Sequence, residues 1–352
     1  MKQINFKKDH ISNVIKNKKV LFITTKNIDY IRNSQEIELL KKLSSEVEII
    51  GYDDKGYISR LIKIYWKLIT ISIKNYDEVF VGFAPQLILP FFGFKFRKKV
   101  IIEDFFISLY DTMINDRKKF KSSSLIGKIL LYLDRITLKR ADEIIVDTHA
   151  HGNYFVRELG ADKSKINVMY LMADSSIYYP RTVKKSKELN NKFLVLYFGS
   201  ILPLQGIEVI LQCIEKMKDI ESVIFQIIGP VPKEYMDKYK TYKNVVFIPW
   251  LSQKALAEKI AAADLCLAGH FNNSIEKALR TIPGKAYIYN VMEKPMILGD
   301  NPANHELFKE DNDNYYYVEM GSSDKLKEKI LYVMENKKFP AVKNYKFQIR
   351  KK

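Results

Sequence analysis

The stretch ALRTIPGKAYIYNVMEKPMILGDNPANHE, residues 278–306, predicts two helix starts separated by a buried strand. Pro283 suits the first turn of a helix, where its missing N–H leaves no hydrogen bond unmade. Residues 295–298 form the apolar strand, and the second helix is expected to begin at His305. This alternation of helix and strand is typical of a doubly wound parallel sheet.

Positive charge surrounds the first of these helix starts. Lys285 lies in the first turn of the helix, and Lys277 and Arg280 precede it. Free N–H groups at a helix N-terminus already favour an anion, and the loop before the second helix offers another set of such groups. We interpret the stretch as a binding element for a diphosphate. An ordinary strand–helix unit with a solvated basic face is the alternative.

Outward from this stretch, both halves of the chain alternate strand-type runs with helix-type runs. Each half predicts an α/β domain with a doubly wound, Rossmann-like parallel sheet, and two such domains facing each other would form a cleft. A charged linker at 182–191 places the boundary near residue 180, which gives domains of residues 1–180 and 181–352. The expected strands are residues 19–24, 47–51, 78–82, 100–103, 143–147 and 165–169 in the first domain, and 193–198, 223–228, 245–248, 265–268 and 295–298 in the second.

The composition is that of a globular protein. The chain has 352 residues, of which 47% are hydrophobic and 28% charged, enough apolar material for two cores. Its two cysteines, Cys213 and Cys266, lie far apart in apolar runs, so we expect buried thiols in a reducing compartment. The first twenty residues lack the apolar core of a signal peptide. We therefore expect a cytoplasmic protein.

A formal net charge of +17 requires an anionic partner or a compositional cause. Phosphorylated substrates, an anionic membrane surface and nucleic acid all fit this charge. The sequence has no zinc-finger, RNA-recognition or basic-zipper pattern, so we expect no nucleic-acid partner. A coding bias toward lysine, isoleucine and asparagine is the alternative explanation.

Residues 83–94 (FAPQLILPFFGF) are uncharged and are followed at once by the basic run KFRKK, residues 95–99. The apolar segment is too short to span a bilayer. An apolar surface beside a basic cluster suits docking at a membrane interface. A buried helix packed on the sheet, with a solvated turn after it, is the alternative.

Polar side chains follow the strands at 100–103 and 143–147. Because ligands of open parallel sheets bind outside the carboxyl ends of the strands, these side chains are candidates for acceptor binding or acid–base chemistry. His149 and His151 have no third ligand at a suitable spacing, so we assign no metal. The Asp-x-Asp pattern at 311–313 is interpreted as a solvated turn. The candidates are Asp104, Ser108, Tyr110, Asp111, Asp116, Arg117 and His149.

The order and spacing of several motifs resemble GT-B glycosyltransferases of the family 4 type, in a bacterial surface-polysaccharide branch. FGSILPLQG (198–206) resembles the glycine-bearing loop after the first strand of that family's C-terminal domain. IPGK (282–285) and EKP (293–295) resemble its Pro-Asn-Lys helix and the turn that follows. DFFISLYD (104–111) and VDT (146–148) resemble segments of its N-terminal domain. The resemblance covers almost the whole chain.

This resemblance implies transfer of a sugar from a nucleotide-sugar donor to an acceptor hydroxyl, with retention of anomeric configuration and with no metal or other cofactor. The C-terminal domain would bind the donor, and the N-terminal domain would bind the acceptor. Arg280 and Lys285 would stabilise the leaving diphosphate, and Asp104 would act as a base or orient the acceptor. The implied donor-binding residues are Gly199, Ser200, Gln205, Gly229, Trp250, Lys277, Asn301, Ala303 and Asn304, and the implied acceptor-binding residues are Ser108, Tyr110, Asp111 and His149.

Some positions depart from the family pattern. Ser200 and Gln205 stand where many members have Arg and Lys, and Ile288 stands where a Glu often contacts the donor ribose. Two functions therefore stay open. One is a glycosyltransferase acting on a lipid-linked or surface-polysaccharide precursor at the inner face of the plasma membrane. The other is a catalytically silent protein of the same fold that binds the membrane or another glycosyltransferase.

Overall fold

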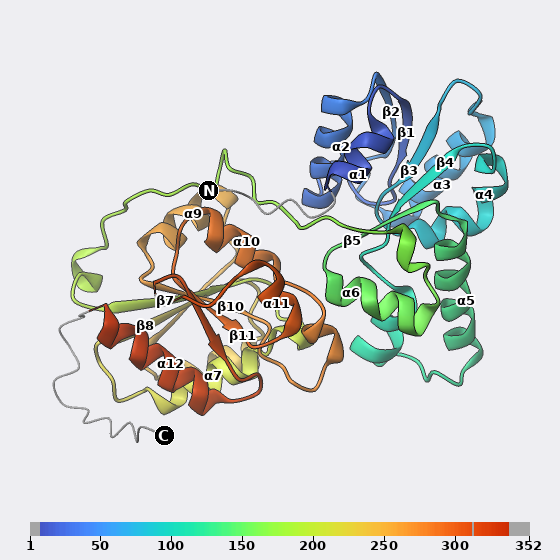
Figure 1. Cartoon of the computed structure of the whole chain (residues 1–352). Helices are drawn as coiled ribbons and strands as arrows, with labels where there is room; N and C mark the ends of the chain where they lie inside the picture. Colours follow the sequence, from blue (N-terminus) through green and yellow to red (C-terminus); the bar gives the residue numbers. More distant parts are fainter. Residues whose placement is uncertain (1–7, 312, 338–352) are drawn as a thin grey trace. The chain divides into compact units, whose positions relative to one another are not determined.

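The computed structural model describes residues 8–311 and 313–337, and it divides into two compact units. The first unit runs to Met172 and includes the separate segment Leu279–Ile282. The second comprises Ala173–Ala278 and the chain from Pro283 onward. Each unit is built around a six-stranded parallel sheet with helices on its faces, so the predicted pair of doubly wound sheets is confirmed (Figure 1).

In the first unit the sheet order is β2-β1-β3-β4-β5-β6. The strands are β1 (Lys19–Ile23), β2 (Glu46–Ile50), β3 (Glu78–Val81), β4 (Val100–Asp104), β5 (Glu143–Val146) and β6 (Ile166–Val168). The helices are α1 (Lys8–Ile15), α2 (Ile31–Leu43), α3 (Tyr57–Thr70), α4 (Leu89–Phe96), α5 (Leu125–Arg140) and α6 (His149–Tyr154).

Strand β1 shows why this sheet is apolar on both faces. Val20 and Phe22 point to one face and pack with α1 and α2. Leu21 and Ile23 point to the other face and pack with α3 and α4. A strand covered on both sides reads as a continuous apolar run, which is why the strand pattern is clear in the sequence.

In the second unit the sheet order is β12-β11-β10-β7-β8-β9. The strands are β7 (Phe193–Phe198), β8 (Val223–Ile228), β9 (Val245–Ile248), β10 (Leu265–Gly269), β11 (Met296–Gly299) and β12 (Tyr315–Val318). The helices are α7 (Ile207–Lys216), α8 (Lys233–Tyr239), α9 (Gln253–Ala262), α10 (Gly284–Val291), α11 (Pro302–Leu307) and α12 (Ser323–Asn336). The strand order reverses between β7 and β10, which makes their carboxyl ends the expected ligand site.

Three local expectations need correction. Helix α11 begins at Pro302 and not at His305, because the Asn301 side chain caps it by accepting the Asn304 N–H at 2.8 Å. The sequence pattern also missed α1 and β12. Most of the apolar segment 83–94 is buried under the sheet, and only Phe91 and Phe94 in it are exposed. The docking interpretation therefore rests on far fewer side chains than predicted.

Three further observations bear on the expectations from composition. None of the helices in residues 8–311 and 313–337 combines the length and apolar character needed to cross a bilayer. The same residues contain no cluster of three or more His, Cys, Asp or Glu side chains arranged to hold a metal ion. Cys213 and Cys266 are buried free thiols, as predicted.

Candidate functional site

Glycines lie at the carboxyl ends of β7, β8 and β10, and they let the loops after these strands approach one another closely. Gly199 follows β7 with φ +138°, and Gly269 ends β10 with φ +80°. A Cβ on Gly229, which follows β8, would lie 2.4 Å from the carbonyl oxygen of Gly199. Any larger residue at 229 would therefore push the two loops apart. The predicted residues Gly199 and Gly229 thus lie side by side at this edge.

Lys285 supplies the charge at this edge. It lies in the first turn of α10, is buried, and donates a hydrogen bond to the side-chain oxygen of Gln205. Its ammonium lies 4.6 Å from the centre of the Tyr197 ring and 3.7 Å from the position of a Cβ built on Gly199. Among the described residues, no carboxylate pairs with it, and burial lowers the pKa of Lys285 to about 7. A buried cation of this kind favours an anionic ligand.

The other predicted donor-binding residues lie along the carboxyl edge of the same sheet, but not all of them contact Lys285. Trp250 is exposed just after β9, and Ser200 is exposed just after Gly199. Asn301, Ala303 and Asn304 are buried at the start of α11, where Asn304 donates to the Gly299 carbonyl at 2.8 Å. Lys277 is half-buried in the short helix Glu276–Leu279. The contacts therefore join Gly199, Gln205, Gly229 and Lys285, and the remaining residues lie around them.

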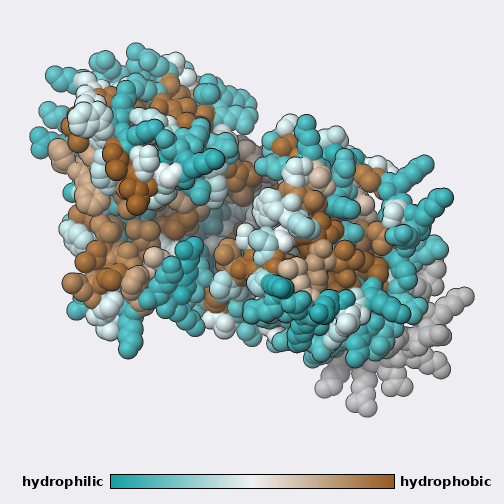
Figure 2. Space-filling model, turned by 180° about the vertical axis from the view of Figure 1, so that it is seen from behind, coloured by the Kyte–Doolittle hydropathy of each residue, from teal (hydrophilic) through white to brown (hydrophobic). Residues whose placement is uncertain are grey.

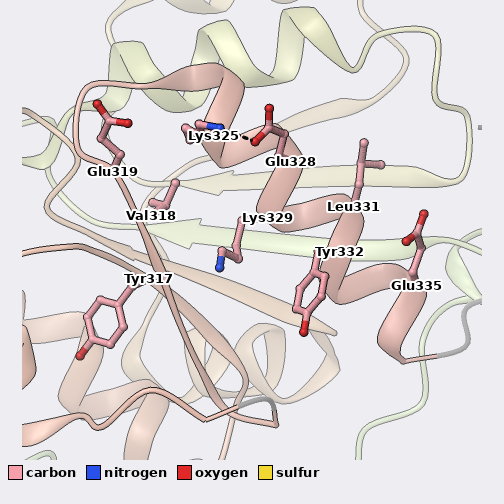
Figure 3. Close-up of a pocket in the computed structure, with 9 residues that line it drawn as sticks. All are labelled: Tyr317, Val318, Glu319, Lys325, Glu328, Lys329, Leu331, Tyr332 and Glu335. Atoms are coloured by element: carbon pink, nitrogen blue, oxygen red, sulfur yellow. Dashed lines mark hydrogen bonds and ion pairs between the residues drawn. The ribbon is translucent and has the colours of Figure 1, made fainter. Parts of the chain in front are cut away.

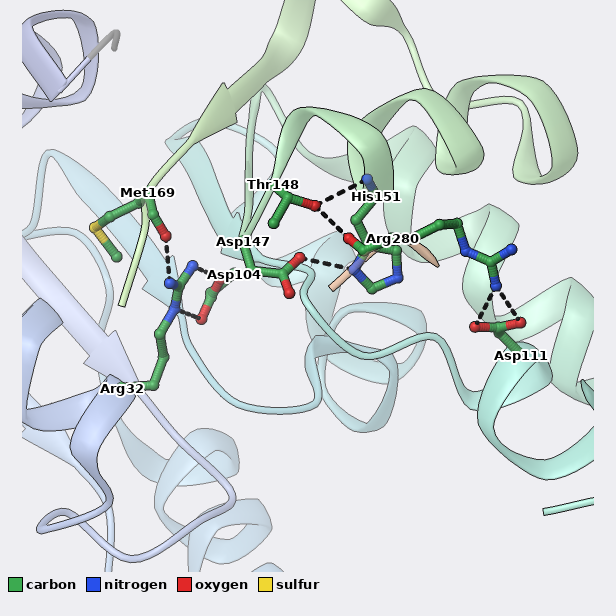
Figure 4. A network of polar contacts seen from close by, with 8 residues as sticks. All are labelled: Arg32, Asp104, Asp111, Asp147, Thr148, His151, Met169 and Arg280. Carbon is green, nitrogen blue, oxygen red and sulfur yellow. Dashed lines mark hydrogen bonds and ion pairs between the residues drawn. The ribbon is translucent and has the colours of Figure 1, made fainter. Parts of the chain in front are cut away.

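Arg280 belongs to the segment Leu279–Ile282 and pairs with a residue of the first unit (Figure 4). Its Nη2 donates to both oxygens of Asp111, at 2.9 and 3.0 Å. Its guanidinium carbon lies 3.7 Å from the centre of the Tyr154 ring, and its carbonyl accepts the Thr148 hydroxyl. The structure thus joins Arg280, predicted as a phosphate-stabilising cation, to Asp111, predicted for the acceptor.

Asp104 lies at the end of β4 with no exposed surface. Both of its oxygens accept from Arg32, each at 2.8 Å, and Arg32 also donates to the Met169 carbonyl (Figure 4). Glu36 lies 3.7 Å from the same guanidinium, and burial raises its pKa well above the usual range. A carboxylate held at two points and shielded from solvent is poorly placed to accept a proton from a substrate. These surroundings favour a structural role for Asp104.

Asp134 on α5, which the sequence analysis missed, organises the loop after β4. It accepts the Ser108 hydroxyl at 2.6 Å and the Tyr110 N–H at 2.9 Å, and Gln86 donates to it at 2.9 Å. Burial raises the pKa of Asp134 to about 6, although these hydrogen bonds oppose the rise. The hydroxyl of Ser108, predicted to contact the acceptor, is therefore already engaged. Tyr110 keeps a half-buried side chain.

The two histidines after β5 have different surroundings. His149 is exposed at the start of α6, and Thr148 caps that helix through the His151 N–H. His151 is buried, with Nδ1 2.7 Å from Asp147 and its ring centre 4.2 Å from that of Phe155. The spacing of four residues between Asp147, just before the cap of α6, and His151 in its first turn was the signal that could have revealed this pair.

A separate hollow of about 380 Å³ lies between β12 and α12 (Figure 3). Its wall includes Lys329, Tyr332 and the ion pair of Lys325 with Glu328, whose atoms lie 2.9 Å apart. Because β12 is the edge strand, this hollow is distinct from the carboxyl ends of β7 and β10. None of the predicted site residues lines it.

Comparisons with known proteins agree with the fold. Residues 192–336 match the family model described as glycosyl transferases group 1, and no curated protein sequence matches the chain. Anabaena HepE in complex with UDP and glucose is similar at 16% identity over 92% of each chain, with a TM-score of 0.61. Sucrose-phosphate synthase from Thermosynechococcus elongatus is similar at 12% identity over 92% of this chain and 91% of that one, with a TM-score of 0.65. The lipopolysaccharide outer core galactosyltransferase WaaB, in its apo form, is similar at 13% identity over 91% of each, with a TM-score of 0.51.

Fold and family model together define the class of protein, a glycosyltransferase of the GT-B fold. Within that class, residues 192–336 match the family model described as glycosyl transferases group 1. The predicted fold class and enzyme class are thereby confirmed. At 12–16% identity, the similarity to these solved structures shows the fold alone.

Proposed function

We propose that the protein transfers a sugar from a nucleotide-sugar donor to an acceptor hydroxyl, with retention of anomeric configuration and without a metal ion. The observation that carries this proposal is the buried ammonium of Lys285, which no carboxylate of the described residues neutralises. As the bond between sugar and diphosphate breaks, negative charge grows on the leaving oxygens. Lys285 and the free N–H groups at the start of α10 stabilise that charge, and the acceptor hydroxyl gives its proton to the leaving phosphate.

The donor is oriented by the residues around Lys285. Gly199 lets the backbone approach the diphosphate beside Lys285, because it carries no Cβ, and Gly229 allows the loop after β7 to pack closely against it. Trp250, exposed after β9, offers a flat surface on which the nucleotide base stacks. Asn301 has a buried side-chain nitrogen with no hydrogen-bond partner among the described residues, so it donates a hydrogen bond to the nucleotide sugar.

The acceptor is a lipid-linked or surface-polysaccharide precursor at the inner face of the plasma membrane. The similarity to WaaB, whose title describes a lipopolysaccharide outer core galactosyltransferase, supports this class of acceptor. The net charge of +17 supports contact with an anionic membrane. Tyr110 and the exposed His149 remain candidates for contact with the acceptor.

The test is thermal stabilisation and product formation with a panel of nucleoside diphosphates and nucleotide sugars, without added metal. We expect stabilisation by one base family, and loss of both stabilisation and transfer in Lys285→Met. The matched control is Lys294→Met, because Lys294 is another mostly buried lysine of the second unit, donating to the Ala261 carbonyl at 2.9 Å. A folded protein that no donor stabilises, or equal effects of the two substitutions, would contradict the proposal.

One observation favours a second function, binding of a partner without transfer. Gln205 stands where many similar enzymes have a second cation, and here its side chain accepts from Lys285 instead of adding charge. A protein that binds a nucleoside diphosphate but yields no product with any donor would support this second function. Restoration of product formation by Gln205→Lys would identify the missing cation as the cause.

A further inference from the structure

Helix α3 is apolar on two opposite sides. Ile64 and Leu68 face the sheet and are buried in the core of the first unit. Four other apolar side chains recur at i, i+4, i+8 and i+11 along the helix and are exposed, with Trp66 at 70%. They are Ile58, Ile62, Trp66 and Ile69. A single exposed isoleucine is ordinary, but an exposed stripe running the length of a helix marks a binding surface.

Helices α4 and α5 extend this apolar surface. The Tyr65 ring of α3 lies 5.1 Å, centre to centre, from that of Phe92 on α4, and Arg140 of α5 donates to the Leu89 carbonyl of α4 at 2.6 Å. The three helices therefore lie next to one another over one face of the sheet. Figure 2 shows hydrophobic areas on the surface of this unit. The exposed apolar side chains of α4 and α5 are Phe91, Phe94, Leu125, Ile126, Ile129 and Tyr132.

We call this surface, formed by the outer sides of α3, α4 and α5, the α3–α5 face. Its charge is strongly one-sided. Residues 57–70, 85–99 and 117–140 contain fifteen lysines and arginines and a single acidic residue, Asp134. These three stretches therefore account for most of the net charge of +17. Asp134 is buried, but so is Arg60, and Lys63 and Lys67 of α3 pair with Asp54 and Glu48. The exposed positive charge of the face therefore comes mainly from residues 85–99 and 117–140.

We propose that the α3–α5 face docks on the surface of a bilayer that contains anionic lipid. Aliphatic and aromatic side chains enter the boundary between head groups and acyl chains, while the long stems of lysine and arginine let their charges reach the lipid phosphates. A second copy of the chain fits this face poorly, because a symmetric contact would bring two strongly basic surfaces together. The inference deepens the proposed function, on which it rests for the use of a membrane-bound acceptor.

The two tryptophans of the sequence allow a direct test. Trp66 lies on the α3–α5 face, and Trp250 is 67% exposed on the second unit. With vesicles that contain phosphatidylglycerol, we expect the emission of Trp66 in Trp250→Phe to shift to the blue and to be quenched by brominated acyl chains. Trp250 in Trp66→Phe should show neither effect. Vesicles of phosphatidylcholine alone should give little change, and added salt should weaken binding.

Sedimentation with the same vesicles measures the contribution of the face. Trp66→Ser combined with Phe94→Ser should lower partitioning by about tenfold or more, because two large apolar side chains no longer enter the bilayer. Trp250→Ser, which removes an equally exposed aromatic side chain, should leave partitioning unchanged. Both substituted side chains of the double variant are exposed, Phe94 at 68%, so the fold should persist.

Three results would overturn the inference: wild-type protein that ignores anionic vesicles, a double variant that partitions like the wild type, or a dimer that the double variant abolishes. The last result would assign the face to a second copy. Thermal stabilisation by the panel of nucleoside diphosphates separates this inference from the proposed function, since the proposed donor site lies in the second unit. Vesicle binding without a response to any nucleoside diphosphate would reject the donor site alone, and the reverse would reject the docking face alone.

Discussion

Arg280 reaches Asp111 with one nitrogen that bridges both carboxylate oxygens, and neither side chain has more than a small exposed fraction. Arg280→Met would leave the Asp111 carboxylate buried without this cation, so we expect the free energy of unfolding to fall by about 3 kcal/mol. Arg157→Met is the control, because its pair with Glu158 is exposed and should matter by less than about 1 kcal/mol. Urea denaturation measures both values. Similar losses for the two variants would contradict the buried pairing.

The lowered pKa of Lys285 predicts that binding of an anionic donor depends on pH. Burial lowers its pKa to about 7 from an unperturbed 10.5, so the unfolded chain holds a proton that the folded protein lacks between these values. The loss in the free energy of unfolding that comes from burying Lys285 therefore grows as the pH falls from 10.5 to about 7. A bound diphosphate favours the charged ammonium, and we expect proton uptake at about pH 8 when the nucleoside diphosphate that stabilises the protein binds. Calorimetry in two buffers of different ionisation enthalpy measures this uptake, which should vanish in Lys285→Met.

Glu103 on β4 is buried, and neither of its side-chain oxygens has a hydrogen-bond partner in the described part of the chain. Burial raises its pKa well above the usual range. The protonated Glu103 side chain therefore favours the folded state. This contribution to the free energy of unfolding is complete below the pKa of about 4.5 in the unfolded chain, and it is lost as the pH rises through the higher pKa of the folded protein. We expect Glu103→Gln to stabilise the protein by about 1–3 kcal/mol at alkaline pH, with no gain near pH 4. Thermal unfolding across this range, with the exposed Glu335→Gln as control, should show a gain that depends on pH.

Gly229 and Gly160 both have a positive φ, but only Gly229 is crowded. A Cβ at 229 would lie 2.4 Å from the Gly199 carbonyl oxygen, whereas a Cβ at 160 would have no neighbour within 4 Å. Gly160→Ala should cost only the backbone strain, about 1 kcal/mol. Gly229→Ala should cost more and should also weaken binding of the nucleoside diphosphate proposed as ligand, because the loop after β7 has to move. Equal effects on stability, with that binding intact, would argue against the close approach of the two loops.

The sequence predicted the two sheets because both faces of each are covered, so that most strands read as unbroken apolar runs. It missed β12, an edge strand of four residues in a run of tyrosines, and it missed α1, a short helix ahead of the first strand. It also placed the start of α11 three residues late, because the capping role of Asn301 was not recognised. Local patterns therefore predicted the architecture well and the boundaries less well.

The residues of the candidate site were likewise predicted only in part. Gly199, Gln205 and Gly229 were predicted because they stand in loops that follow a strand, and Lys285 because it stands at a helix start marked by Pro283. The pair of Arg32 with Asp104 joins residues 72 positions apart, and no local pattern shows such a pair. Asp134 looked like one polar position of the helix 125–140, although the structure turns it inward. Partners of buried charges depend on tertiary packing, and they decide which predicted side chains remain available to a substrate.

The segment Leu279–Ile282 has a consequence for the order in which the protein is synthesised. It belongs to the first unit, although Ala278 and Pro283 on either side of it belong to the second. Asp111 and Arg280 are 169 positions apart, so at ordinary elongation rates the ribosome delivers the arginine roughly 10–30 seconds after the aspartate. During that interval the first unit holds an acidic group without this cation. The first unit therefore completes its fold only after most of the second has left the ribosome.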